Sequence, residues 1–198
     1  MALEQSPVVV SPASIPVDAA RVGQVHPVAP DQERTPYQLG MPYGVVPDLV
    51  LPEVLAADER IWVPQSAAVS FRPLLFGVSH GYYVNVLRVR RSGVLSRHRH
   101  AGPVHAHVLR GRWHYLEHDW EAVEGGYAFE VPGEVHTLVV PDDVEEMMTL
   151  FHVSGALVYV DPYGTATGYE DVFTKLALAR RHYAEVGLGA DYADQFVR

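Results

Sequence analysis

The sequence contains no cysteine, which excludes disulfide bonds and thiolate metal sites. Any bound metal must therefore be held by nitrogen and oxygen ligands. Basic residues are also few, because 15 lysines and arginines stand against 24 aspartates and glutamates, giving a net charge of -9. This acidity argues against partners such as nucleic acids or anionic membranes, which attract basic surfaces.

Long apolar runs are absent as well. No stretch approaches the roughly 18 apolar residues of a membrane-spanning helix. Residues 1–20 lack the basic start and the continuous apolar core of a secretory signal, so we expect a cytoplasmic protein. Hydrophobic residues make up 48% of the chain, which is enough for a sizeable core, and the length suggests one domain with tails.

The chain changes character twice. Residues 1–47 are rich in proline, which excludes a helix and predicts an extended arm with short edge strands. Disorder is the alternative for the first 20 or so residues. Residues 48–165 show short runs of strand-forming residues separated by glycine, proline and aspartate, a pattern typical of a sandwich or barrel. The predicted strands include Tyr82–Arg90, Val104–Arg110, Gly111–Leu116, Tyr127–Val131, His136–Val140 and Met147–Val153.

Residues 166–198 are predicted to form a helical segment. Within it, residues 169–186 carry apolar side chains at helical spacing. The stretch begins with acids and ends with bases, as the helix dipole prefers, and glycines follow it. We expect an amphipathic helix that packs on the barrel or on a partner subunit.

The histidines are concentrated in one part of the chain, since six of the 11 lie between residues 98 and 118. His98 and His100 are separated by one residue, so on a strand their side chains point to the same side. His105 and His107 repeat this spacing, and His136 begins a later strand after a Pro-Gly turn. Two histidines from one strand and one from a paired strand would form a facial set with open coordination positions, which suits a redox-active or Lewis-acid metal.

Two segments resemble the motifs of the cupin superfamily. Gly93–His100, followed by His105 and Gly111, is similar to the first motif, and residues 126–136 are similar to the second. The usual glutamate ligand of the first motif is replaced by His105, and the spacing to Gly111 is one residue short. The missing glutamate favours the three-histidine iron dioxygenases, and residues 98–120 most resemble the 2,4′-dihydroxyacetophenone dioxygenases.

The resemblance implies an all-β fold, a cupin β-barrel of the jelly-roll type with an extended N-terminal arm and a C-terminal amphipathic helix. It also implies a non-haem iron(II) dioxygenase that uses O2 to cleave a C–C bond of an aryl hydroxyketone, giving an aromatic carboxylate and formate. His98, His100 and His136 would hold the Fe2+, although zinc, manganese or nickel can take the same ligands. His105 would orient substrate and move protons beside the metal, or serve as a fourth, exchangeable ligand.

The partners implied are a small aromatic ketone and O2, so the pocket should be apolar with few polar anchors. For the aromatic candidates, ordinary barrel core is the competing role. The candidate wall residues are Trp113, Tyr115, Leu138, Val140, Phe129 and Phe151. The strand before the first motif offers polar anchors at Tyr83, Asn85, Arg88 and Arg90, whereas Glu130 and Glu134 flank the second motif without an assigned role.

Two other functions stay open on the sequence alone. The chain can be another metal-dependent cupin, such as a β-diketone dioxygenase, an isomerase or a decarboxylase, because a fold does not fix a function. It can also be a non-catalytic, zinc-binding cupin sensor, because zinc accepts the same histidines. Cupin barrels commonly pair, so we expect a homodimer or homotetramer.

Overall fold

The computed structural model describes residues 29–198, and the expectations for residues 1–28 lie outside that range. The chain divides into two units, Met1–Pro47 and Asp48–Arg198. In residues 29–47 the backbone forms turns with local hydrogen bonds, such as the 2.8 Å bond from the Gln32 amide to the Ala29 carbonyl. These residues contain neither helix nor strand, so the edge strands predicted for this part of the arm are not formed.

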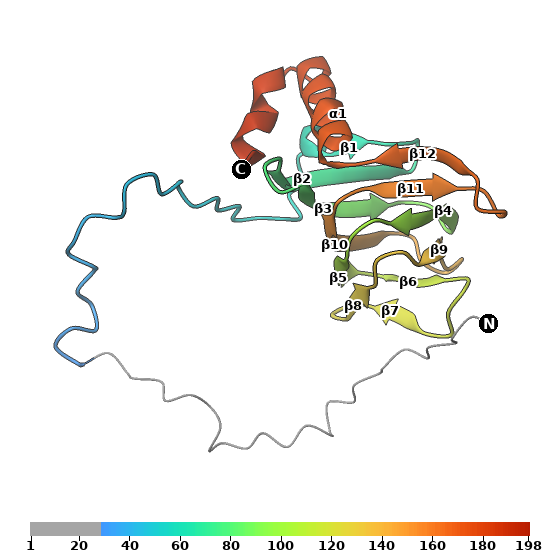
Figure 1. The fold of residues 1–198 in the computed structure, drawn as a ribbon, viewed down its shortest axis with the longest axis horizontal. Coiled ribbons are helices and arrows are strands. Elements are labelled where there is room, and N and C mark those ends of the chain that lie inside the picture. The colour runs from blue at the N-terminus through green and yellow to red at the C-terminus, as the bar shows by residue number, and fades with distance from the viewer. Residues whose placement is uncertain (1–28) are drawn as a thin grey trace. The chain divides into compact units, whose positions relative to one another are not determined.

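Residues 48–198 form a jelly roll of two six-stranded antiparallel sheets (Figure 1). The first sheet has the order β1-β2-β3-β10-β5-β8 and the second the order β12-β11-β4-β9-β6-β7. The strands of the first sheet are β1 (Val63–Pro64), β2 (Val69–Gly77), β3 (Tyr82–Val89), β10 (Met147–Ser154), β5 (Val104–Arg110) and β8 (Tyr127–Glu130). Those of the second are β12 (Ala166–Glu170), β11 (Leu157–Val160), β4 (Gly93–His100), β9 (Val135–Val140), β6 (Arg112–Tyr115) and β7 (Glu121–Val123). The all-β fold class predicted from the sequence is confirmed.

The core lies between the two sheets. Side chains alternate along each strand, so on β5 Val104, Ala106 and Val108 point into the core and are buried. The sheets also meet through a polar contact, because the indole N–H of Trp113 on β6 donates to Thr149 Oγ1 on β10 at 3.0 Å.

A C-terminal helix, α1 (Val172–Glu185), follows β12 and packs against β1 and β2 (Figure 1). Asp171 caps it, because the Asp171 carboxylate accepts the Thr174 amide while Thr174 Oγ1 accepts the Asp171 amide. The segment differs from the prediction in its first residues, 166–170, which form β12. Two short 3-10 helices, η3 (Glu59–Ile61) and η4 (Ala190–Phe196), complete the fold. None of the helices within residues 29–198 is long and apolar enough to cross a membrane.

Candidate metal centre

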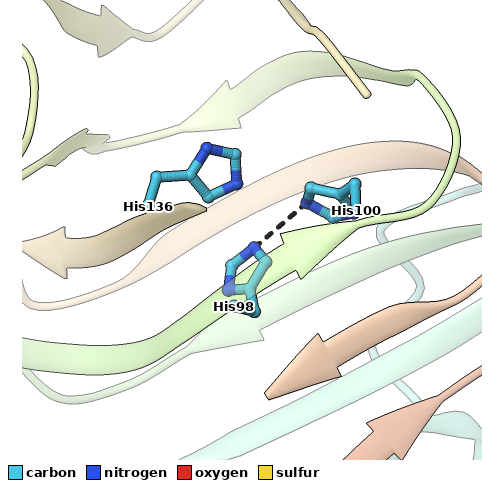
Figure 2. Close-up of side chains that lie close together, drawn as sticks. All are labelled: His98, His100 and His136. Atoms are coloured by element: carbon cyan, nitrogen blue, oxygen red, sulfur yellow. Dashed lines mark hydrogen bonds between the residues drawn. The ribbon is translucent and has the colours of Figure 1, made fainter. Parts of the chain in front are cut away.

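Three histidines from neighbouring strands converge inside the jelly roll. His98 on β4 pairs directly with His136 on β9, and His100 lies two residues further along β4 on the same face. All three side chains are buried, with at most 4% of any residue exposed. Figure 2 shows the three rings turned toward a common point, and their potential ligand nitrogens all lie within 4.8 Å of one another. The structure therefore brings the three predicted ligands together, and we call His98, His100 and His136 the metal group.

The atoms of this group fit a divalent metal ion. The Nε2 atoms of His98 and His100 are 3.0 Å apart, the separation of two nitrogens that each lie about 2.1 Å from one ion at a right angle. Buried polar atoms almost always have a hydrogen-bond partner. Nevertheless, both ring nitrogens of His136 and both carboxylate oxygens of Glu130 are buried without one. A bound cation would satisfy Nε2 of His136 and compensate the charge of the carboxylate.

Burial keeps the imidazoles of His98 and His136 neutral. It holds the pKa of His98 well below its ordinary value, and the nearby His100 and His136 lower that pKa further. Burial also lowers the pKa of His136 to about 4, although the Glu130 carboxylate acts in the opposite direction. Because a neutral imidazole is the form that binds a metal, these two histidines need not lose a proton at neutral pH.

A carboxylate that the sequence interpretation left without a role joins the group. Glu130 ends β8 in the opposite sheet and is only 3% exposed. Its Oε2 lies 3.1 Å from Nε2 of His100 and 3.7 Å from Nε2 of His136, without hydrogen-bond geometry to either ring. A buried carboxylate is costly unless a charge or a metal compensates it. The strand period of β8 was the available signal, because it puts Ala128 and Glu130 on one face.

His105 does not join the group, which corrects the role predicted for it. Val104 is fully buried, so strand alternation turns His105 to the outer face of β5. There the Nδ1 atom of His105 lies 2.8 Å from the Tyr127 hydroxyl oxygen, and the His105 ring stacks on His152 at 5.7 Å. His107 faces the same way, with its ring 5.0 Å from that of Tyr127.

Only some of the predicted wall residues line the cavity. Tyr115 and Leu138 line a cavity beside the histidines, whereas Trp113 lies wholly in the core and does not. Tyr115 also supports the metal group, because its ring stacks on that of His136 at 3.9 Å with 5° between the planes. Burial raises the pKa of Tyr115 well above its usual value, and the Glu130 carboxylate raises it further. Phe129, by contrast, is half exposed.

The cavity has a volume of about 240 Å³ and is reached by side chains of both sheets. His98, His100 and Glu130 form one part of its wall. The apolar part comprises Val69, Leu87, Leu95, Leu138, Phe151, Val153 and Leu157. A polar part, which the sequence did not reveal as a unit, comprises Gln65, Tyr83, Asn85, Tyr159, Glu170 and Lys175.

A second carboxylate lies near Nδ1, the other ring nitrogen of His136. One oxygen of Glu134 lies 3.1 Å from Nε2 of His118, and the other lies 3.9 Å from Nδ1 of His136. Metal-binding histidines commonly present their second nitrogen to a carboxylate, which fixes the orientation of the ring. His118 therefore holds Glu134 near the metal group.

Comparison with known proteins assigns the chain to a family. The family model of the ChrR cupin-like domain matches residues 52–158 of this sequence, which is more than half of the chain. The chain belongs to the ChrR cupin-like family. This cupin matches no protein among those with curated descriptions.

Solved structures share the fold of this ChrR-like cupin at low sequence identity. An RmlC-like cupin protein from Ralstonia eutropha JMP134 is 24% identical, with a TM-score of 0.62 over 64% of this chain and 83% of its own. A cupin-like protein of unknown function from the same organism is 23% identical, with a TM-score of 0.61 over 70% and 90%. An acetylacetone dioxygenase from Acinetobacter johnsonii is 17% identical, with a TM-score of 0.58 over 72% and 99%.

Proposed function

We propose that this cupin is a non-haem iron(II) dioxygenase that cleaves a C–C bond of an aryl hydroxyketone to an aromatic carboxylate and formate. The observation that carries the proposal is the buried group of His98, His100 and His136, of which His98 and His100 line a largely apolar cavity. A facial set of three protein ligands with open coordination positions is typical of non-haem iron oxygenases. The cavity volume of about 240 Å³ favours a substrate with a single ring.

The side chains of the site have separate roles in this proposal. His98, His100 and His136 would hold the iron, which when bound supplies Lewis acidity and the capacity to react with O2. Tyr115 fixes the plane of His136 by stacking on it. Leu138, Phe151 and the other apolar wall residues exclude water from the ring of the substrate.

Glu130 is the candidate general base. Its Oε2 lies beside the histidine nitrogens that would hold the iron, and Glu130 lines the cavity that the hydroxyketone would occupy. There it can accept the proton that the substrate releases, which requires a base within hydrogen-bond reach of the reacting group. In the overall reaction one O2 adds to the hydroxyketone, the bond between the carbonyl and hydroxymethyl carbons breaks, and each acid product gains one oxygen atom.

Oxygen uptake by the iron-loaded protein tests this function. With an aryl hydroxyketone we expect one O2 consumed and one formate released per substrate, and with labelled O2 we expect one labelled oxygen atom in each acid. His98→Ala should abolish uptake. Absence of uptake with every aryl hydroxyketone would show the proposal to be wrong.

A β-diketone is the second candidate substrate, because a solved structure of this fold is an acetylacetone dioxygenase. Acetylacetone therefore belongs in the same assay. Uptake with acetylacetone alone would assign the diketone reaction. Stoichiometric zinc in protein purified without added metal, together with no uptake after iron replacement, would instead indicate a non-catalytic zinc-binding cupin.

A further inference from the structure

A second set of potential metal ligands adjoins the metal group at the other ring nitrogen of His136. His118, Glu134 and His136 each offer one ligand atom, and these atoms all lie within 4.8 Å of one another. One oxygen of Glu134 lies 3.1 Å from Nε2 of His118, and the other lies 3.9 Å from Nδ1 of His136. We call these three residues the outer group.

The separations within the outer group suit a single ion. Two ligand atoms that each lie about 2.1 Å from one ion are about 3.0 Å apart at a right angle and about 4.2 Å apart on opposite sides of it. The distances of 3.1 and 3.9 Å fall within this range. Two imidazole nitrogens and a carboxylate are ligands that zinc and copper(II) accept.

Nδ1 of His136 gives an independent indication of a ligand. The His136 side chain is fully buried, and its Nδ1 has no hydrogen-bond partner within residues 29–198. At 3.9 Å the Glu134 oxygen is too distant for a hydrogen bond. An ion in the metal group would engage Nε2, the nitrogen next to Glu130, and would leave Nδ1 unsatisfied. Because an unsatisfied buried nitrogen is destabilising, its presence points to a second ligand.

The outer group is open to solvent on one side and held in place on the other. The side chains of Glu134 and His118 are 36% and 18% exposed, so an ion can approach past them. The His118 ring stacks on that of Trp120 at 5.2 Å with 19° between the planes. The loop that carries Glu134 is attached to β4, because the Gly133 amide donates to the His100 carbonyl at 2.9 Å.

We propose that His118, Glu134 and Nδ1 of His136 form a second metal site, for zinc or copper(II), in which the His136 ring bridges two ions. The second ion takes the place of the Nδ1 proton, which passes to solvent. Because two like charges then share one ring, the outer site is the weaker and fills after the metal group. The inference depends on the metal group but not on the dioxygenase reaction.

Zinc titration of the full chain, followed by calorimetry and equilibrium dialysis, tests the site without oxygen chemistry. The unaltered protein should bind two zinc ions in two steps. His118→Ala should bind only the first, and Glu134→Gln should weaken the second step by about tenfold or more. His114→Ala is the matched control, because His114 lies on the outer face of β6, and it should keep both steps.

Copper(II) adds a signature that a separate surface site would not give. A bridging imidazolate couples the unpaired electrons of the two ions, so the low-temperature electron paramagnetic resonance signal of the two-copper protein should integrate to well below two spins. The one-copper His118→Ala protein should show its full single spin. Circular dichroism verifies that each variant is folded.

A single zinc ion in the unaltered protein, a second ion that survives His118→Ala or is lost in His114→Ala, or two uncoupled copper spins would overturn the inference. Two zinc ions and coupled coppers without oxygen uptake would retain the outer site and refute the dioxygenase. Oxygen uptake by a protein that binds a single ion would do the reverse.

Discussion

At the scale of single residues, Glu130 changes the charge expected at the metal group. The sequence predicted a site of three neutral imidazoles. The structure adds the buried carboxylate of Glu130 from the opposite sheet, with its Oε2 3.1 Å from Nε2 of His100. A carboxylate lowers the net charge of a bound divalent ion and attracts the ion into a buried site. The cation affinity of the site should therefore depend on this residue.

Replacing Glu130 by glutamine tests that dependence, because the change removes the charge and keeps the size. We expect Glu130→Gln to weaken metal binding by about 10–100-fold, the usual effect of removing a carboxylate next to a metal group. Competition with a chromogenic chelator measures the affinity. Unchanged affinity in Glu130→Gln would show that the carboxylate does not assist binding.

Alanine variants of the histidines should distinguish the three metal ligands from His105. Alanine at His98, His100 or His136 should each abolish stoichiometric metal binding, because each supplies a nitrogen to the group. His105→Ala should leave the metal content and oxygen uptake unchanged, because His105 faces away from the cavity. Metal analysis of the four purified variants decides this, and a metal-free His105→Ala protein would restore His105 as a ligand.

The sequence could predict the metal group but not the position of His105. His98 and His100 lie on one strand, so their spacing alone sets them on one face. His105 lies beyond the turn at Ala101-Gly102-Pro103, and a shift of one residue there exchanges the inner and outer faces. Glu130 was missed for a related reason, because its direction depends on how β8 pairs with β5.

At the scale of elements, strands with clear alternation were predictable and the others were not. β5 has the predicted bounds, and β3 and β10 differ from theirs by one residue at an end. β12, with the sequence ATGYE, was missed because it lacks apolar alternation and is a strand only by pairing with β11. α1 was predictable, since Asp171 provides the expected N-terminal signal.

η3 is tied to β3 by charge, which gives a pH-dependent contribution to stability. Glu59 accepts Arg88 at 3.0 and 2.7 Å and also pairs with Arg90. The hydrogen bond from Arg88 is the main cause that lowers the pKa of Glu59. Because the folded pKa is lowered, this stabilisation is present above the ordinary value of 4.5 and is lost as pH falls through the folded value.

Glu59→Gln should therefore lower the free energy of unfolding at pH 7 by roughly 0.5–1 kcal/mol, a small amount because Glu59 is largely exposed. Urea unfolding of both proteins measures the difference. The difference should shrink toward zero as the pH drops below the folded pKa of Glu59. A difference that is the same at pH 7 and at pH 3 would contradict the electrostatic explanation.

At the scale of the whole molecule, the metal group lies where the two sheets meet, since Glu130 belongs to one sheet and the histidines to the other. A bound ion would therefore connect both sheets and stabilise the folded chain. At a free metal concentration 100 times the dissociation constant, the gain is about 2.7 kcal/mol. Thermal unfolding should shift upward with metal and return with a chelator, and His136→Ala should show no shift.

The assembly is a further property at this scale. The homodimer or homotetramer expected from the sequence stays a prediction, which light scattering on the purified full chain would check. The fold itself was accessible from the sequence because regular short strands and glycine turns are local signals. The cavity was not, because its wall combines side chains that are distant along the chain, such as Asn85 on β3 and Lys175 on α1.

The stack of Tyr115 on His136 gives the protein a built-in optical reporter. Two of its three tryptophans, Trp113 and Trp120, have ring centroids 5.0 and 5.5 Å from that of Tyr115. A paramagnetic ion held by His136 would thus be separated from these fluorophores by the stacked rings of Tyr115 and His136, close enough to quench their emission. Titration of the chain with such ions can be followed by its own ultraviolet fluorescence, with no added dye.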